Sequence, residues 1–282
     1  MHRNRFAVFG QPVAHSRSPS IHAAFATQCG VDLDYVRIEA SPEDFAVAVE
    51  RFAREGGRGA NVTLPHKPAA AALCTTRSER AARADAVNTL VRVDDASDGA
   101  PRWHGDNTDG IGLLRDLRDR HGLRLDGARV LLIGAGGAAA GVAPALLDAG
   151  VALLAIRNRN SGRGDALATR LNDARVQALA WDDADDAVFD VVINSTSAAR
   201  SDAAIDWPFL HAGADGWAAV DLGYGRDAAM FLEAARARGA AACIDGLGML
   251  VEQAAEGFRL WHGVMPDTAP VYDLLRREMP AP

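Results

Sequence analysis

The stretch from Val130 to Gly141 constrains the fold more than any other part of the chain. Its first four residues are apolar, as is typical of a buried strand in a parallel sheet, and glycine follows them without a spacer. The pattern Gly-x-Gly-x-x-Ala begins at Gly134 and ends at Ala139. In a dinucleotide-binding turn, the first glycine permits a tight bend and the second lets a pyrophosphate approach the backbone. The third small residue lets the following helix pack closely on the strand.

A second apolar run gives this glycine turn the context of a βαβ unit rather than a flexible loop. Val151–Ile156 follows a helix-compatible segment that closes at Gly150. The intervening helix would present its positive N-terminal end to an anion. We therefore expect a dinucleotide site, with the phosphates held by consecutive residues of the turn: Gly134, Ala135, Gly136, Gly137 and Ala138.

The end of the second strand of this unit distinguishes NAD from NADP. An NAD site usually has Asp or Glu about 20 residues after the glycines, where it binds the ribose 2′-hydroxyl. This chain has Arg157, Arg159 and Arg163 there, and no acid before Asp165. Guanidinium groups bind phosphate through paired hydrogen bonds, so the sequence predicts NADP. The alternative is three solvated arginines at a strand end.

Composition narrows the class of protein. A chain of 282 residues can form one large domain or two of moderate size. A net charge of −7 argues against a nucleic-acid partner, and no apolar run approaches the roughly 18 residues of a membrane helix. The three cysteines are widely spaced, which is typical of reduced thiols rather than of a disulfide or zinc framework. We expect a cytoplasmic protein without a metal, a monomer or homodimer, whose partner is a small molecule.

Strands and helices are expected to alternate along the whole chain. Before the glycine turn, strands are predicted at 6–9, 35–39, 60–62, 86–91 and around Trp103. Helices are predicted at 18–29, 41–56, 77–84 and 111–120, and a polar connection over 94–101. Ser18 followed by Pro19 predicts an N-cap and the first helical residue. After the turn, strands are predicted at 188–193, 218–222 and 240–244. Two final helices, over 249–262 and 268–278, are expected to pack on the first domain.

The basic residues are unusual because Lys67 is the single lysine among 30 lysines and arginines. A lysine can release its proton when its surroundings favour the neutral amine, whereas an arginine effectively cannot. Lys67 is therefore a candidate for proton transfer, although a lone lysine could also survive by chance.

Several segments are more specific in combination than singly. They are Ser16–Pro19, Asn61–Lys67, Ala86–Thr89, Gly105–Gly110, the glycine turn, Asn158–Arg159, Tyr224 and Asp245–Leu250. In this order and spacing, the chain resembles the shikimate dehydrogenase family almost from end to end.

The resemblance implies a fold and an activity. The fold would be α/β, with a substrate-binding and catalytic domain over 1–108 plus 246–282, a Rossmann-type NADP-binding domain over 109–245, and a cleft between them. The activity would be the reversible NADPH-dependent reduction of 3-dehydroshikimate to shikimate, in aromatic amino-acid biosynthesis.

The resemblance also implies residue roles. Lys67 and Asp109 would be the catalytic pair. The substrate carboxylate would bind to Ser16 and Ser18, the ring hydroxyls to Asn61, Thr63, Asn88 and Gln253, and Tyr224 would close one side of the substrate pocket. Beside the glycine turn, the cofactor would contact Asn158, Arg159, Arg163, Thr196 and Gly246.

Each role has a simpler alternative. Lys67 and Asp109 could form a salt bridge between exposed groups, Ser18 could be only an N-cap, and the polar residues could merely satisfy turn backbone. At the level of function, the alternatives are a quinate/shikimate dehydrogenase that uses NAD, and a non-catalytic nucleotide-binding sensor. The retained Lys67 and Asp109 argue against a sensor, and the serine pair favours shikimate over quinate.

Overall fold

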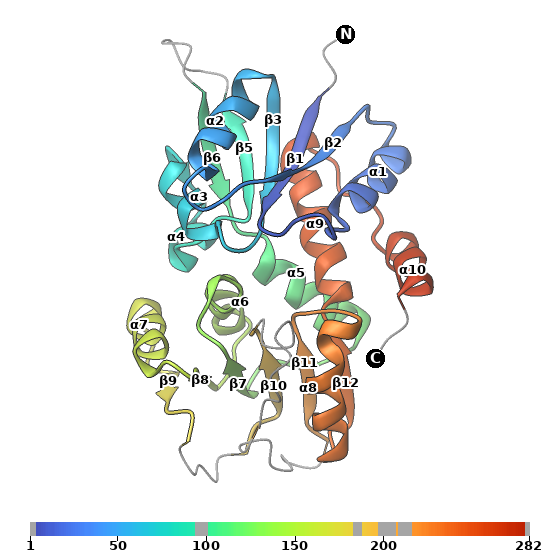
Figure 1. The fold of residues 1–282 in the computed structure, drawn as a ribbon. Helices are drawn as coiled ribbons and strands as arrows, with labels where there is room; N and C mark the ends of the chain where they lie inside the picture. The colour runs from blue at the N-terminus through green and yellow to red at the C-terminus, as the bar shows by residue number, and fades with distance from the viewer. Residues whose placement is uncertain (1–3, 94–100, 183–187, 197–206, 208–215, 280–282) are drawn as a thin grey trace. The chain divides into compact units, whose positions relative to one another are not determined.

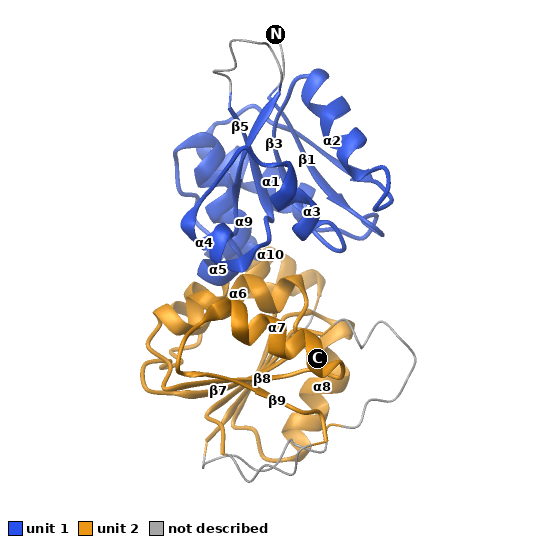
Figure 2. Cartoon of the chain, turned by 90° about the vertical axis from the view of Figure 1, so that its left-hand side faces the viewer, with its two compact units in different colours: residues 1–112, 251–271 blue, residues 113–250, 272–282 orange. Residues whose placement is uncertain are grey.

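The computed structural model describes residues 4–93, 101–182, 188–196, 207 and 216–279 (Figure 1). The chain divides into two compact units, residues 1–112 with 251–271 and residues 113–250 with 272–282 (Figure 2). Each unit contains its own six-stranded sheet. The predicted α/β class with two domains is confirmed, and most of the polar connection expected over 94–101 lies outside the described residues.

The sheet of the first unit is mixed. Its spatial order is β2-β1-β3-β5-β6-β4. The strands are β1 (Arg5–Gly10), β2 (Asp34–Glu39), β3 (Gly57–Val62), β4 (Thr76–Arg77), β5 (Thr89–Val93) and β6 (Arg102–Asp106). β1 runs parallel to β2 and β3, whereas β5 is antiparallel to β3 and β6. The end of β3 therefore lies beside the start of β5 and the end of β6, which brings polar residues from separate segments to one edge.

Helices cover both faces of this sheet. They are α1 (Ser18–Cys29), α2 (Phe45–Arg54), α3 (Lys67–Leu73), α4 (Glu79–Ala84) and α9 (Leu247–His262), the last beginning in the second unit. Helix α5 (Asp109–Arg115) follows β6 and continues from the first unit into the second. Alternation along β1 assigns the two faces. The ring of Phe9 packs edge-on against the rings of Phe45 and Phe52 of α2. On the other face, the ring centroids of Phe6 and Trp261 of α9 lie 4.8 Å apart.

The sheet of the second unit is entirely parallel, in the order β12-β11-β10-β7-β8-β9. The strands are β7 (Arg129–Ile133), β8 (Leu153–Arg157), β9 (Val176–Leu179), β10 (Val191–Asn194), β11 (Ala218–Asp221) and β12 (Ala242–Asp245), with helices α6 (Gly137–Asp148), α7 (Ser161–Leu171) and α8 (Arg226–Ala237). The strand order reverses between β7 and β10, and ligands of doubly wound sheets bind at the carboxyl ends of the strands at such a switch point. The glycine turn follows β7 at this position.

Two local predictions are corrected. Helix α1 begins at Ser18, so Arg17 is its N-cap and no side chain caps it. The reason is that the Ser18 amide already donates to Ser16 Oγ at 3.3 Å, which draws Ser18 into the first turn. The helix expected over 111–120 is α5 followed by a π-helical turn, η1 (Asp116–Arg120).

The last helix, α10 (Ala269–Glu278), does not pack wholly on the first unit as expected. From Tyr272 onward it belongs to the second unit. The Arg120 guanidinium lies 3.8 Å from the centre of the Tyr272 ring, and Arg276 forms an ion pair with Asp245. None of the helices in the described ranges is long and apolar enough to cross a membrane.

Candidate active site

Lys67 and Asp109 form a buried ion pair in the first unit. They are the first residues of α3 and α5, and Lys67 Nζ lies 2.5 Å from Asp109 Oδ2. Their side chains are only 11% and 6% exposed. The pair is therefore not the bridge between two exposed groups that the sequence left open. Because breaking a buried pair leaves an uncompensated charge, each partner depends on the other.

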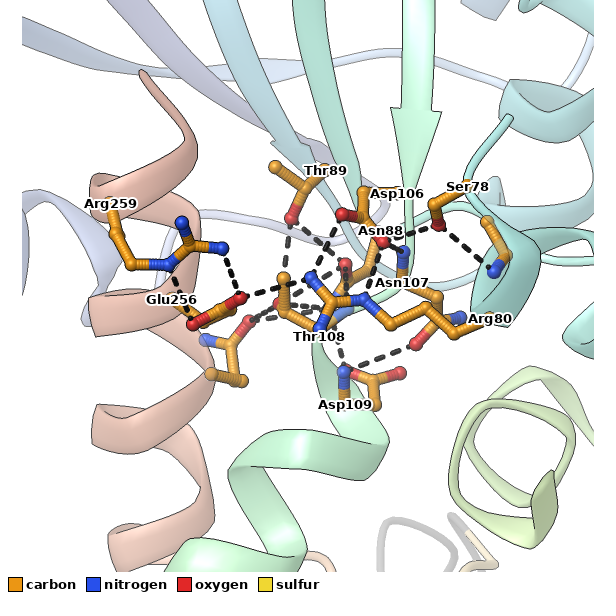
Figure 3. A network of polar contacts seen from close by, with 12 residues as sticks. Ser78, Arg80, Asn88, Thr89, Asp106, Asn107, Thr108, Asp109, Glu256 and Arg259 are labelled. Atoms are coloured by element: carbon orange, nitrogen blue, oxygen red, sulfur yellow. Dashed lines mark hydrogen bonds and ion pairs between the residues drawn. The ribbon is translucent and has the colours of Figure 1, made fainter. Parts of the chain in front are cut away.

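Asn88 connects this pair to two other segments. Its Nδ2 donates to Asp109 Oδ1 at 2.8 Å, to Thr108 Oγ1 at 3.0 Å and to Gln253 Oε1 at 3.3 Å. Its Oδ1 accepts from the Thr108 amide at 2.9 Å. Figure 3 shows Asn88 and Thr108 within the network of polar contacts where β5 begins and β6 ends. The structure thus brings together four predicted residues, Lys67, Asp109, Asn88 and Gln253.

Asn61 on β3 is held by two residues that the sequence analysis did not identify. Its Oδ1 accepts from the Tyr35 hydroxyl at 2.6 Å and from His22 Nε2 at 3.0 Å. Burial lowers the pKa of His22 to about 3, so the ring is neutral. Asn61 Nδ2 donates to the Asn88 carbonyl at 3.4 Å, which links Asn61 to the group around Lys67. Isolated His and Tyr residues carry no sequence signal for this role.

The two predicted serines lie together. Ser16 Oγ donates to Ser18 Oγ at 3.2 Å, and the Ser16 carbonyl accepts two hydrogen bonds from Arg37, at 2.7 and 3.0 Å. The Tyr35 hydroxyl that holds Asn61 also contacts Ser18. Thr63 follows β3, and its methyl group lies so close to Gly10 that a Cβ there would meet it at 2.5 Å. The side chains of Ser16, Ser18 and Thr63 are neutral hydrogen-bonding groups, as suits the hydroxyl and carboxylate oxygens of a small ligand.

The glycine turn of the second unit has the expected shape. Gly134 has φ 106°, and a Cβ there would meet Ser195 Oγ at 2.5 Å, so a larger residue cannot fit. Gly136 is the N-cap of the twelve-residue helix α6, and a Cβ there would meet no described atom within 4 Å. Ala139 is fully buried in the core between this helix and the sheet. Packing within the protein therefore requires Gly134 and Ala139, but not Gly136.

The three arginines at and after the end of β8 differ in exposure. Arg157 is only 1% exposed, whereas Arg159 and Arg163 are exposed. Asn160 caps α7 by accepting from the Arg163 amide at 3.3 Å, and its carbonyl accepts from Asn158 Nδ2 at 2.7 Å. The alternative of three solvated arginines is therefore wrong for one of them. Of the two exposed arginines, Arg159 lies between β8 and α7 and Arg163 lies in the first turn of α7, and no acid precedes Asp165 in this segment.

The ends of β10 and β11 are joined by a buried acid. Asn194 Nδ2 donates to Asp221 Oδ2 at 2.7 Å, and Asn194 Oδ1 accepts from Thr196 Oγ1 at 2.8 Å. Burial raises the pKa of Asp221 to about 7. These contacts fix Thr196 beside Gly134, where a Cβ would meet the Thr196 methyl at 3.1 Å.

The remaining predicted residues, Tyr224 and Gly246, also belong to the second unit. The Gly246 amide donates to the Gly223 carbonyl at 2.7 Å, and a Cβ at Gly246 would meet the Leu222 carbonyl at 2.4 Å. The segment that precedes Tyr224 is thus packed on Gly246. Tyr224 is the one predicted substrate-binding residue that lies in the second unit.

Models of three protein domains match the chain. They are the shikimate dehydrogenase substrate binding domain over residues 8–90, shikimate / quinate 5-dehydrogenase over 116–205, and the shikimate 5′-dehydrogenase C-terminal domain over 246–276. The shikimate dehydrogenase (NADP(+)) of Xanthomonas campestris pv. campestris (strain B100) is 55% identical over 97% of this chain and 95% of its own. That of Xylella fastidiosa (strain 9a5c) is 53% identical over 99% of this chain and 98% of its own.

Solved structures agree with these matches. The shikimate 5-dehydrogenase (AroE) of Thermus thermophilus, in complex with NADP(H) and shikimate, has a TM-score of 0.83 and 35% identity. The match covers 98% of this chain and 100% of that chain.

Proposed function

Because the chain belongs to the shikimate dehydrogenase family, we propose that it reduces 3-dehydroshikimate to shikimate, reversibly and with NADPH. The observation that carries the proposal is the buried Lys67–Asp109 pair, hydrogen-bonded to a group of neutral amides. A sensor that only binds a nucleotide has no need of such a pair, since an unused buried charge pair costs desolvation energy.

The proton that the reaction needs comes from Lys67. Hydride addition to the carbonyl carbon leaves negative charge on the carbonyl oxygen, and the ammonium donates a proton to that oxygen. Asp109 holds the ammonium in place, and Asn88 holds the second oxygen of that carboxylate. In the oxidative direction, the Lys67 amine accepts the proton of the hydroxyl group. Asn61, Thr63, Asn88 and Gln253 bind the ring hydroxyls, Ser16 and Ser18 the carboxylate, and Tyr224 closes one side of the pocket.

The second unit fits NADP. The positive end of α6 and the glycine turn would hold the pyrophosphate. Packing within the described protein leaves room for a side chain at position 136, so the close approach of a ligand explains the glycine there. Arg159 and Arg163 would bind the 2′-phosphate, with Asn158, Thr196 and Gly246 completing the site. NADPH supplies the hydride when it is bound.

Changing Lys67 tests the proton transfer. Lys67→Arg keeps the positive charge but removes a group that can release a proton. We expect kcat to fall by a factor on the order of 10²–10⁴, with much smaller changes in the KM of shikimate and NADP. A largely electrostatic role predicts instead that arginine restores most of the activity.

An amine-directed reagent offers a separate test, because Lys67 is the single lysine and the N-terminus is the other amine. We expect inactivation to follow modification of Lys67 and shikimate to slow it. Normal turnover by protein that is fully modified at Lys67 would rule out proton transfer by this residue.

Changing Arg159 tests the cofactor assignment. Arg159→Asp places an acid where NAD sites have one, and we expect it to raise the KM of NADP far more than that of NAD. Arg170→Asp, at an exposed position of the last turn of α7, is the matched control and should leave the ratio unchanged. Equal efficiency of the unmodified protein with NAD and NADP would contradict the assignment.

The same assays separate the alternatives. Comparable kcat/KM values for quinate and shikimate, measured with NAD, would indicate a quinate/shikimate dehydrogenase. No turnover of either acid with either NAD or NADP would indicate a sensor. We further place the protein in the cytoplasm, as a monomer or homodimer. The three cysteines, Cys29, Cys74 and Cys243, are free, as expected in a reducing compartment.

A further inference from the structure

Arg80 in α4 lies at the centre of an ionic cluster with Asp106, Glu256 and Arg259 (Figure 3). Its Nε and Nη2 donate to the two oxygens of Asp106 at 2.6 and 2.8 Å, and Nη2 also reaches Glu256 Oε1 at 3.1 Å. Asp106 and Glu256 are 3% and 2% exposed, so both acids are buried. One guanidinium therefore joins two buried carboxylates from β6 and α9.

Arg259 offers a comparison within the same cluster. Its Nη2 and Nε donate to Glu256 at 2.7 and 3.2 Å. Its side chain is 44% exposed and donates hydrogen bonds to Glu256, whereas Asp106 of β6 acts on it only through its charge in the described structure. Arg80 and Arg259 thus share one buried acid, but Arg80 alone of the two binds Asp106 in the described structure.

From Asp106, hydrogen bonds continue through Asn107 to the backbone amide of Asp109. Asp106 Oδ1 accepts from the Asn107 amide at 2.7 Å and from Ser78 Oγ at 2.6 Å. Asn107 Oδ1 in turn accepts from the Asp109 amide at 3.1 Å, and Asn107 Nδ2 donates to the Ala86 carbonyl at 2.9 Å. The backbone that carries Asp109 is therefore held through the orientation of Asp106.

From Glu256, the connection runs along α9 to Gln253. The two residues are three apart, so they lie on the same face of the helix. Gln253 Oε1 accepts from Asn88 Nδ2 and Thr108 Oγ1, both at 3.3 Å. Arg80 thus joins the end of β6, three residues before Asp109, to α9, which carries Gln253.

We propose that Arg80 is a positioning residue of the active site, which sets Asp109 and Gln253 relative to each other through Asp106 and Glu256. The proposal rests on the proposed function for the roles of those two residues. A guanidinium suits this position because its rigid fork binds one carboxylate through two bonds and still offers a donor to a second. Without it, two buried carboxylates face each other with one partner fewer, and Asp106 turns away from the Asn107 amide.

The test compares Arg80→Gln with Arg259→Gln, using shikimate and NADP. Misplacement of a reacting group by about 1 Å can cost on the order of 10² in rate, so we expect kcat of Arg80→Gln to fall by about 10- to 100-fold. The KM of NADP should stay within about twofold, because binding of the cofactor is unaffected. Arg259→Gln should lower thermal stability but keep kcat within about threefold of the wild type, since it leaves the bonds of Asp106 intact.

Arg80→Lys separates geometry from charge. A lysine supplies the charge to one carboxylate but cannot reproduce the fork. We expect Arg80→Lys to recover thermal stability while kcat stays low. If Arg80→Gln does not fold, Arg80→Lys takes its place in the comparison with Arg259→Gln. Recovery of both stability and kcat, or equal losses of kcat in the Arg80 and Arg259 variants, overturns the proposal.

A readout that needs no turnover keeps this test apart from that of the proposed function. If the wild type does not oxidise shikimate, the proposed function fails. The positioning by Arg80 is then measured through the rate at which trinitrobenzenesulfonate modifies Lys67 at fixed pH. We expect that rate to rise in Arg80→Gln, because a displaced Asp109 no longer covers the amine, and to stay unchanged in Arg259→Gln. An unchanged rate in both overturns the proposal.

Discussion

The side-chain amide of Asn61 is fixed in one orientation because its oxygen accepts two hydrogen bonds. The donors are the Tyr35 hydroxyl and Nε2 of His22. Burial lowers the pKa of His22 to about 3, so the ring is neutral and carries the single N–H that donates to Asn61. Burial also raises the pKa of Tyr35, so its hydroxyl keeps its proton. The Asn61 NH₂ group must therefore face the opposite side, toward the Asn88 carbonyl.

Tyr35→Phe tests whether this orientation serves substrate binding. The ring still stacks on His22, whose centroid lies 4.6 Å away, but the bonds to Asn61 and Ser18 are lost. Loss of one such bond costs roughly 1 kcal/mol, so we expect the KM of shikimate to rise about fivefold, with little change in kcat or in the KM of NADP. Steady-state kinetics measure this, with Tyr272→Phe in α10 as the control. An unchanged KM of shikimate would show that Asn61 needs no such support.

At the scale of elements, the carboxyl ends of β10 and β11 meet through Asp221. It accepts from Asn194 Nδ2 and from the Gly223 amide, both at 2.7 Å, and burial raises its pKa to about 7. An unfolded Asp loses its proton near pH 3.9, about three units lower. Between these values unfolding releases a proton, so the free energy of unfolding decreases as pH rises from about 4 to about 7, by up to a few kcal/mol.

Asp221→Asn should flatten this pH dependence, because an amide does not titrate. Urea denaturation at pH 5 and pH 7.5 measures the difference in the free energy of unfolding between the two conditions. We expect that difference to shrink in Asp221→Asn and to remain in Asp165→Asn, which changes an exposed acid of α7. An equal difference in both variants would mean that Asp221 is ionised throughout this range.

Elements with a local sequence signal were predictable, and contacts between distant segments were not. Apolar runs and the glycine pattern predict β7, α6 and β8 because a strand and a tight turn follow from neighbouring residues. The resemblance predicts Gln253 through its family, whereas Arg80 and Glu256 lie 176 positions apart and no local pattern pairs them. The prediction that Ser18 caps α1 is wrong for the same reason. The Ser-Pro pair is local, but the bond from the Ser18 amide to Ser16 that displaces the cap depends on the preceding loop.

At the scale of the whole chain, the C-terminal segment returns to the second unit and binds an acid at the end of its sheet. Residues 272–282 belong to that unit although they follow the helix α9, most of which lies in the first. Arg276 binds both oxygens of Asp245, at 2.5 and 2.9 Å, and this bonding raises the pKa of the guanidinium further. Asp245 also accepts from the backbone amides of Gly225 and Leu247, at 3.2 and 3.3 Å. The last helix thus secures the carboxylate that organises two turns at the end of the parallel sheet.

Arg276→Ala removes the charged partner of a carboxylate that is only 1% exposed. We expect the free energy of unfolding to fall by about 2–3 kcal/mol, because the buried carboxyl group of Asp245 loses its charged partner and two hydrogen bonds. Arg277→Ala changes the next residue of the same helix, which is exposed, and surface changes of this kind usually stay within about 0.5 kcal/mol. Calorimetry or urea denaturation of both variants measures the contrast. Since Asp245 precedes Gly246, we also expect Arg276→Ala to weaken NADP binding while shikimate binding is retained. Equal stabilities of the two variants would show that the turns at the end of β12 hold without the last helix.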